Sequence, residues 1–319
     1  MTSTTHLPRL KQANTRDFDE QADLLEGWQQ HYAQLSSGHF KGAIVELLFD
    51  DIHLFSESTS HALFQSGKLD DGLCAVGVPI HTGEHGTFCG EAMRADTAHI
   101  FSGRDGFEFH SPSRLTMGGI VAPVSALPAW LQEKEPLTRR AHLKSVQLKV
   151  LREVGEFLSL AFSLCSEYPG LLESEKFRQQ LRKGVIACLV DILDDPASTA
   201  LRNEPPQKHW QLVRQAREYL HGMQDAAVDI EQLCHELGVS RRTLQYSFQE
   251  QVRMTPVAYL RAQRLNGVRQ MLKHCCSVTE AATAWGFWHF GHFSQEYKKL
   301  FGELPSDTLR RHGGESMSH

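Results

Sequence analysis

An internal repeat near the end of the chain limits its possible folds more than any other feature. The stretch from Asp229 to Phe248 is followed by a similar one from Val278 to Tyr297. In each, a short apolar segment leads to a glycine and then to apolar residues four apart, the pattern of a helix, a turn and a second helix. The two glycines, Gly238 and Gly286, are 48 residues apart. The repeat therefore predicts two helix-turn-helix units.

The second helix of each unit is expected to carry a polar outer face. In the first copy Leu244 and Phe248 mark the buried side, and Ser240 suits the N-cap. Arginine can donate two hydrogen bonds to guanine O6 and N7, and glutamine can pair with adenine N6 and N7 in the major groove. A solvated face would explain one such copy, but two copies joined by a helix favour DNA. The candidate DNA-binding residues are Ser240, Arg241, Arg242, Gln245, Tyr246 and Gln249 in the first copy and His289, His292, Ser294 and Gln295 in the second.

Length and charge fit this organisation. A chain of 319 residues with 41% hydrophobic residues predicts two globular domains. Residues 205–319 hold 14 Lys and Arg against 11 Asp and Glu, which gives them a net charge of +3. Because the whole chain has a net charge of −5, residues 1–204 carry −8. A basic end on an acidic body indicates an anionic partner. A charge of +3 is too small for a nonspecific, chromatin-like DNA binder.

The first half of the chain reads as a β domain. Residues 1–20 are polar and are expected to fray. Apolar runs of four to eight residues between turn signals then predict a small β-barrel or sandwich, with a cupin-like fold as one form of it. With the helical end, the fold class is α+β. The predicted strands are Ala43–Phe49, Ile52–Ser56, Ala62–Gln65, Leu73–Pro79, Ala98–Phe101, Phe107–His110 and Leu115–Val121.

Helical spacing follows the strands. Apolar residues three to four apart predict helices over 143–161 and 171–193, with Pro169-Gly170 between them. This pair either caps the β domain or forms a dimer seam. The polar, proline-containing stretch that follows predicts a linker. The expected domains are 1–194 for sensing and dimerisation, 195–206 for the linker and 207–319 for DNA binding.

From about His209 to Arg311 the chain resembles the DNA-binding domain of the AraC/XylS regulators. The similarity lies in Gly286-Phe287, Phe293, Tyr297-Lys298 and the later Gly302 and Pro305. It implies a tandem clamp that reads two major-groove segments roughly 34 Å apart. RNA polymerase is then an expected partner. The second copy departs from the family, since Phe290 and Gly291 stand where polar base-reading residues are common.

Upstream segments resemble the sensor region of the ethanolamine-utilisation operon regulators. The similar stretches are Trp28–Leu35, Gly38–Gly42, Val45–Phe55 and Gly77–Ile80. The resemblance implies an activator that responds to ethanolamine with adenosylcobalamin. Regulators of other amine or amino-acid catabolic operons are the alternative. Four residues are near enough in sequence to supply the acidic or aromatic groups of an amine pocket: Trp28, Glu46, Asp50 and Phe55.

The remaining groups of histidine, cysteine, tryptophan and carboxylate residues are interpreted as surface or core residues rather than as functional sites. His81 and His85 fall in a predicted turn, with His53 and His61 nearby in sequence, and no metal site is assigned. The adjacent Cys275 and Cys276 are unsuited to an unstrained bridge. Trp285 is expected in the core, and Trp288 in turn packing or a backbone contact. The carboxylates Glu46, Asp50, Asp51 and Glu57 are expected on a solvated strand face.

No catalytic set emerges, so the chain is expected not to be an enzyme. A cupin-type metalloenzyme with a helical appendage is the rival, but it leaves the paired helix-turn-helix unexplained. Seven scattered cysteines without a CxxC pair fit reduced thiols. No leader or membrane-spanning run is found, so a cytoplasmic transcription regulator that binds double-stranded DNA is predicted.

Overall fold

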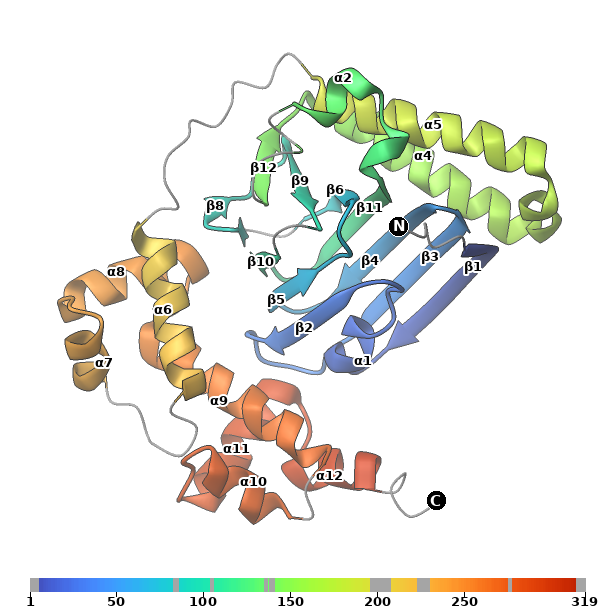
Figure 1. Cartoon of the computed structure of the whole chain (residues 1–319). Helices are drawn as coiled ribbons and strands as arrows, with labels where there is room; N and C mark the ends of the chain where they lie inside the picture. The colour runs from blue at the N-terminus through green and yellow to red at the C-terminus, as the bar shows by residue number, and fades with distance from the viewer. Residues whose placement is uncertain are drawn as a thin grey trace. The chain divides into compact units, whose positions relative to one another are not determined.

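The computed structural model describes residues 6–82, 86–103, 106–134, 137, 141–195, 208–222, 230–274 and 277–313. It contains two compact units (Figure 1). The first consists of residues 1–32, 41–60 and 64–204, and the second of residues 33–40, 61–63 and 205–319. Most of the predicted linker lies outside the described residues, so its bounds stay a prediction.

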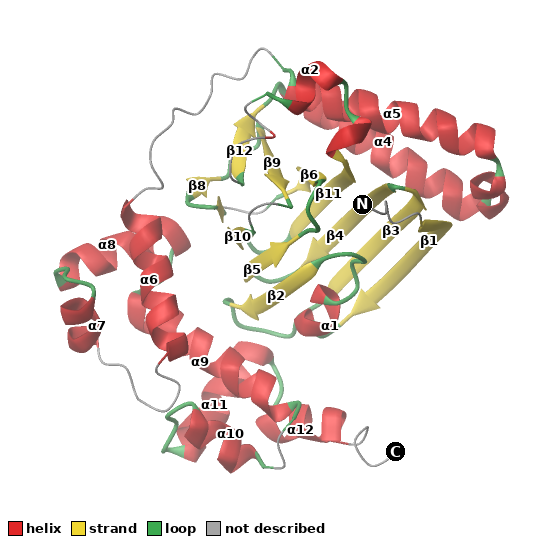
Figure 2. Cartoon of the chain, in the orientation of Figure 1, coloured by secondary structure: helices red, strands yellow, loops and turns green. Residues whose placement is uncertain are grey.

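The first unit contains most of two antiparallel sheets. The larger has the strand order β1-β3-β4-β11-β6-β9-β12, and the smaller β2-β5-β10-β7-β8. All seven predicted strands are confirmed, and the α+β class is confirmed with them (Figure 2). The strands are β1 His6–Thr15, β2 Gln29–Gln34, β3 Gly42–Asp50, β4 Ile52–Thr59, β5 Leu63–Lys68, β6 Leu73–His81, β7 Thr87–Phe88, β8 Glu91–Ala92, β9 Thr97–Ser102, β10 Phe107–His110, β11 Leu115–Pro123 and β12 His142–Ser145.

Two expectations about this unit are wrong. Residues 6–15 form the edge strand β1 rather than a frayed end, because their backbone pairs with β3. Leu143 lies in β12, which pairs with β9, so the first long helix begins at Leu148 instead of near 143. In both places the pairing partner is distant in sequence, and local periodicity does not report it.

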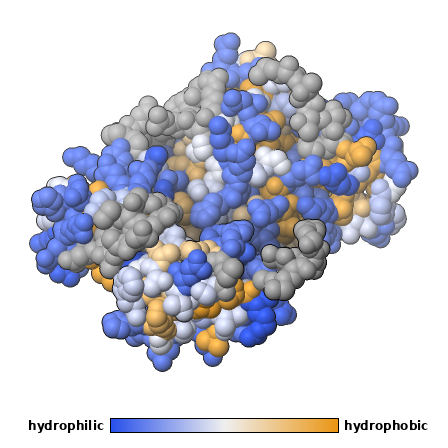
Figure 3. Space-filling model, turned by 60° about the horizontal axis from the view of Figure 1, so that its bottom comes forward, coloured by the Kyte–Doolittle hydropathy of each residue, from blue (hydrophilic) through white to orange (hydrophobic). Residues whose placement is uncertain are grey.

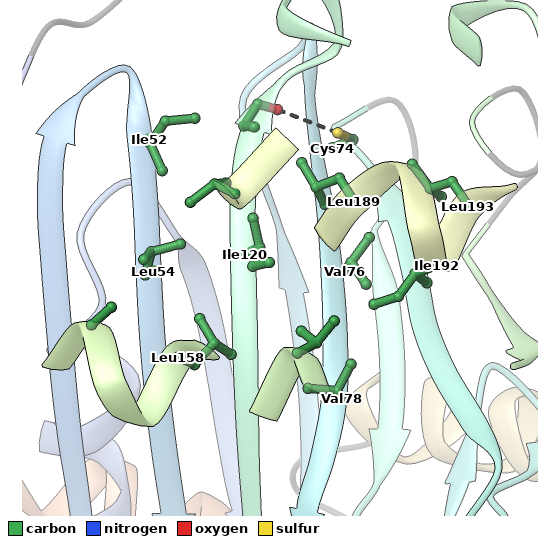
Figure 4. Close-up of a cluster of buried hydrophobic side chains, with 14 of the residues drawn as sticks. Ile52, Leu54, Cys74, Val76, Val78, Ile120, Leu158, Leu189, Ile192 and Leu193 are labelled. Atoms are coloured by element: carbon green, nitrogen blue, oxygen red, sulfur yellow. Dashed lines mark hydrogen bonds between the residues drawn. The ribbon is translucent and has the colours of Figure 1, made fainter. Parts of the chain in front are cut away.

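One face of the larger sheet is covered by α4 (Leu148–Glu167) and α5 (Glu175–Leu193), with η2 (Pro169–Glu173) between them. Leu158 of α4 and Leu189 of α5 are fully buried, with Leu54 and Ile120 of the sheet, in one hydrophobic cluster (Figure 4). In the same cluster the Cys74 thiol donates to Ala122 O at 3.4 Å. The helix pair therefore caps the β domain, and a dimer seam stays a prediction.

The second unit is helical and contains both repeats. Its helices are α6 (Lys208–Gly222), α7 (Ile230–Glu236), α8 (Arg241–Val252), α9 (Pro256–Leu272), α10 (Val278–Ala284), α11 (Phe290–Phe301) and α12 (Pro305–Gly313). Thr255 caps α9 by accepting from Ala258 N at 3.2 Å, and Pro256 occupies the first position, where no amide is needed. Tyr259, Leu265, Val268 and Leu272 of α9 are buried. This long helix joins the two repeats.

The short segments 33–40 and 61–63 belong to the same unit, and Gln34 of the first is hydrogen-bonded to α9. Asn266 of α9 donates to Gln34 O and accepts from Gln34 N, both at 2.8 Å. Gln34 and Asn266 are only 1% and 4% exposed. The amide of Asn266 thus satisfies backbone groups that would otherwise be buried without partners.

Candidate nucleic-acid interface

The first repeat consists of α7, a glycine turn and α8. Leu233, Leu244 and Phe248 are completely buried and hold the two helices together. Gly238 has a φ of +62°, which permits the chain to leave α7, and Val239 N donates to Cys234 O at 3.0 Å. Ser240 then caps α8 by accepting from Thr243 N at 3.1 Å. The turn therefore presents α8 in a fixed orientation.

The outer face of α8 is polar, as its sequence predicts. Tyr246, 57% exposed, contacts His209 of α6 edge-on, with ring centroids 5.0 Å apart. His209 in turn shares a 2.8 Å hydrogen bond with the Ser247 hydroxyl. Among the candidate residues of this copy the following are exposed: Ser240, Arg241, Arg242, Gln245, Tyr246 and Gln249.

The second repeat uses the same scaffold. Ser277 caps α10 by accepting from Glu280 N at 3.1 Å, and Gly286 turns the chain at a φ of +70°. Phe293 and Tyr297 are buried at the positions of Leu244 and Phe248. Of the candidate residues in this copy, Ser294 is half-buried and three are exposed: His289, His292 and Gln295.

Arg264 of α9 braces the second turn. It donates to Trp285 O from Nε at 2.9 Å and from Nη2 at 2.6 Å, and to Gly286 O at 2.7 Å. Its guanidinium lies 4.7 Å from the centre of the Phe287 ring. A Cβ on Gly267 would meet the Trp285 ring at 2.2 Å, so Trp285 packs closely on α9. Trp285 is half-buried, so it packs against α9 at the edge of the core rather than fully inside it as predicted.

A buried polar network joins α9, α11 and α12, and sequence patterns did not reveal it. Arg269, 3% exposed, donates to Glu303 Oε1 at 2.5 Å, and the Thr308 hydroxyl donates to the same oxygen at 2.7 Å. Burial would raise the pKa of Glu303, but the hydrogen bonds from Arg269 and Thr308 outweigh it and lower that pKa. The only sign of this network in the sequence was Arg269 itself, an arginine among the apolar residues of α9. The network fixes the far end of the second repeat.

In the β domain, three of the four residues suggested for an amine pocket come together. Trp28 lies edge-on to Phe55, Phe101 and Phe107, with centroid distances of 5.4, 5.4 and 6.1 Å. Glu46 pairs with Phe55 across β3 and β4. Trp28 Nε1 is buried, and within the part of the chain that the structure describes it has no hydrogen-bond partner. The fourth residue, Asp50, pairs with Arg178 of α5 at 3.2 Å instead.

The predicted solvation of the strand carboxylates is wrong for two of them. Glu46 is 0% exposed, and its Oε1 accepts from Glu26 N at 2.7 Å and lies 3.0 Å from His53 Nε2. Burial would raise the pKa of Glu46, but His53 and the Glu26 amide lower it, so Glu46 is ionised. Glu57 is buried too, where the Tyr32 hydroxyl donates to it at 2.9 Å, and burial raises its pKa. His53 lies on β4, Tyr32 on β2 and Glu26 in a turn, so the folding of the β domain brings these partners to the carboxylates.

A second buried imidazole lies among aromatic rings. The His99 ring is 4.5 Å from Phe88 and 4.8 Å from Phe109 between centroids, and burial lowers its pKa to about 3. Its Nε2 has no hydrogen-bond partner within the described residues. His99 is therefore neutral at physiological pH. The inner face of the β domain thus combines aromatic rings with one ionised carboxylate and buried imidazoles.

Within the described residues, no group of three or more His, Cys, Asp or Glu comes together as a metal-ligand set, and His81 is exposed. His85, Cys275 and Cys276 lie outside the described residues. No described helix is long and apolar enough to cross a membrane.

Comparison with known proteins agrees with the geometry of the second unit. Residues 233–311 match the model of a helix-turn-helix domain. The XylDLEGF operon transcriptional activator 3 of Pseudomonas putida is 30% identical over 166 residues, which are 50% of this chain and 49% of that protein. The probable thc operon regulatory protein of Rhodococcus erythropolis is 38% identical over 103 residues, 31% of each chain. The chain thus spans about half the length, or less, of these relatives.

The solved structures that resemble this chain are also described as AraC-type regulators. A probable AraC family transcriptional regulator from Rhodopseudomonas palustris is 34% identical, covering 32% of this chain and 97% of that one, with a TM-score of 0.30. The AraC-like transcriptional activator CuxR is 16% identical over 80% of this chain and 94% of its own, with a TM-score of 0.39. Because these TM-scores are low, the comparison rests on the sequence matches. The sequence matches therefore show a helix-turn-helix domain over residues 233–311, and this part of the chain is similar to transcription regulators of the AraC/XylS type.

Proposed function

We propose that this chain binds a specific operator in double-stranded DNA through both repeats and regulates transcription in response to a small molecule. The observation that carries the proposal is the pair of glycine turns, each presenting a helix with a buried apolar side and an exposed face. Arg242 and Gln245 on α8 have the side chains that read guanine and adenine. Two such units in one chain supply what dimeric repressors obtain by symmetry.

The β domain is the proposed sensor. Rings of Trp28, Phe55 and Phe101 beside the ionised Glu46 suit an ammonium group, since aromatic faces and a carboxylate both attract cations. We therefore propose a small amine as the effector, with ethanolamine together with adenosylcobalamin as the first candidate. Another amine or an amino acid is the alternative. None of the relatives named above is an ethanolamine regulator.

The remaining parts of the proposal are based on the resemblance to AraC/XylS-type regulators. Residues 1–194 are proposed to sense and to dimerise, and residues 207–319 to bind DNA. The relatives named as operon activators favour activation, with RNA polymerase as the partner and the cytoplasm as the place of action.

The DNA-binding proposal is tested with Arg242→Ala in the full chain. An operator selected from random duplexes should be bound about ten- to a hundredfold more weakly by this variant, a loss of about 1–3 kcal/mol. Binding to random DNA should change little. Lys183→Ala is the matched control, since it removes one exposed positive charge from α5. Equal losses on operator and random DNA would make Arg242 a phosphate contact rather than a base reader.

The effector proposal is tested by thermal unfolding of the full chain. A ligand at a hundredfold excess over its Kd stabilises the folded protein by about 2.7 kcal/mol, so the effector should raise the melting temperature measurably. Glu46→Gln should abolish that shift, whereas Glu156→Gln, an exposed carboxylate on α4, should retain it. If another amine or amino acid shifts the melting temperature and ethanolamine with adenosylcobalamin does not, the ethanolamine assignment is wrong. DNA binding would be unaffected by that outcome.

A further inference from the structure

The second repeat exposes aromatic rings that its fold does not require. Trp288 is 64% exposed and Phe290 40%, whereas the neighbouring Phe287 and Phe293 are 7% and 1% exposed, with rings 5.1 Å apart. Burying apolar side chains stabilises a protein, so rings left in water contribute little to this fold. On the face of the molecule shown in Figure 3, hydrophobic patches lie between hydrophilic residues. We call Trp288, Phe290 and the adjacent Gly291 the aromatic surface.

Gly291 is a second, independent sign of a partner. It lies within α11, is exposed, and its φ is not in the left-handed region. A Cβ added there would meet no atom within 4 Å. Gly291 is the second residue of α11, and nothing in the described residues requires a glycine there. A glycine of this kind permits close approach of the backbone to something outside the chain.

We propose that the aromatic surface contacts thymine methyl groups in the major groove, so that the second repeat reads A·T base pairs by apolar contact. This inference rests on the proposed DNA-binding function. α11 corresponds in the repeat to α8, and the thymine 5-methyl is the apolar group that the major groove offers. The missing side chain of Gly291 lets α11 lie closer to the base edges.

The charges around α11 are compatible with DNA as the occupant. Lys298 and Lys299 on the same helix are exposed. Glu296, the acidic residue of α11, is ion-paired with Arg261 of α9, which also lies 3.3 Å from His292 Nδ1. The carboxylate is therefore neutralised within the protein and does not repel phosphates.

The first experiment substitutes Gly291→Ala in the full chain. Operator affinity should fall about tenfold although the melting temperature stays equal or rises, because the methyl group has space in the free protein. Gly170→Ala is the matched control: this glycine is also exposed, without a positive φ and with open space at Cβ. It should leave operator affinity unchanged. An unchanged affinity for Gly291→Ala would overturn the proposal.

The second experiment replaces thymine by uracil in each half of the operator, which removes only the 5-methyl group. Uracil in the half bound by the second repeat should weaken wild-type binding several-fold, and it should have no further effect on a Trp288→Ala/Phe290→Ala variant. If that variant binds the operator normally but activates transcription poorly, the surface contacts a protein such as RNA polymerase and the proposal is wrong. A wild-type chain without any sequence preference would instead refute the proposed function itself.

Discussion

In the first repeat, α8 buries Leu244 and Phe248 and exposes arginine, glutamine and tyrosine. In the second, α11 buries Phe293 and Tyr297 at the equivalent positions, and tryptophan, histidine and phenylalanine are exposed around its start. Both turns use a glycine at positive φ. The buried positions therefore maintain one scaffold, while the exposed positions are free to differ. This division explains how one fold could read two unlike DNA segments.

The largest expected effect tests whether the two scaffolds are equivalent. Phe248→Ala and Tyr297→Ala each remove a ring that is 0% exposed at equivalent positions of the two repeats, so each should destabilise the helical unit by about 3–5 kcal/mol. Denaturant unfolding of the full-length variants measures both losses. Trp288→Ala is the exposed aromatic control and should stay within about 0.5 kcal/mol of wild type. A large loss in only one of the two core variants would show that the repeats are not equivalent scaffolds.

The repeat was predictable because its information is local. Leu244 and Phe248, or Phe293 and Tyr297, are four residues apart on one helix face, so the spacing defines both the helices and their exposed candidates. The edge strand β1 was not predictable in this way, because its polar residues become a strand only by pairing with β3. Likewise, the burial of Glu46 depends on His53 and Glu26, which the fold of the β domain brings to it. The strand β1 and the burial of Glu46 therefore depend on contacts between residues distant in sequence, which local patterns do not contain.

An intermediate effect is expected at the brace of the second turn. Arg264→Ala removes the donors to Trp285 O and Gly286 O, and leaving such carbonyls unpaired costs about 1–3 kcal/mol. Arg264→Lys keeps the charge but not the planar fork, so it should restore only part of the loss. Footprinting on the operator should show weakened protection in the half bound by the second repeat, with the first half retained. Equal weakening of both halves would contradict a role confined to the second turn.

The smallest expected effect separates the two reading helices at their first turns. The Ser240 side chain caps α8 by accepting from Thr243 N at 3.1 Å, whereas His289, the N-cap residue of α11, makes no such bond. Ser240→Ala should therefore cost about 1 kcal/mol of stability, because an amide at the start of α8 loses its acceptor. His289→Ala should stay within about 0.5 kcal/mol. Denaturant unfolding measures the stability loss of both variants. Because DNA is absent from this measurement, a base contact by Ser240 does not contribute to the result. Equal losses would mean that His289 also caps its helix in solution, and the two reading helices would then differ in their exposed side chains but not in how they begin.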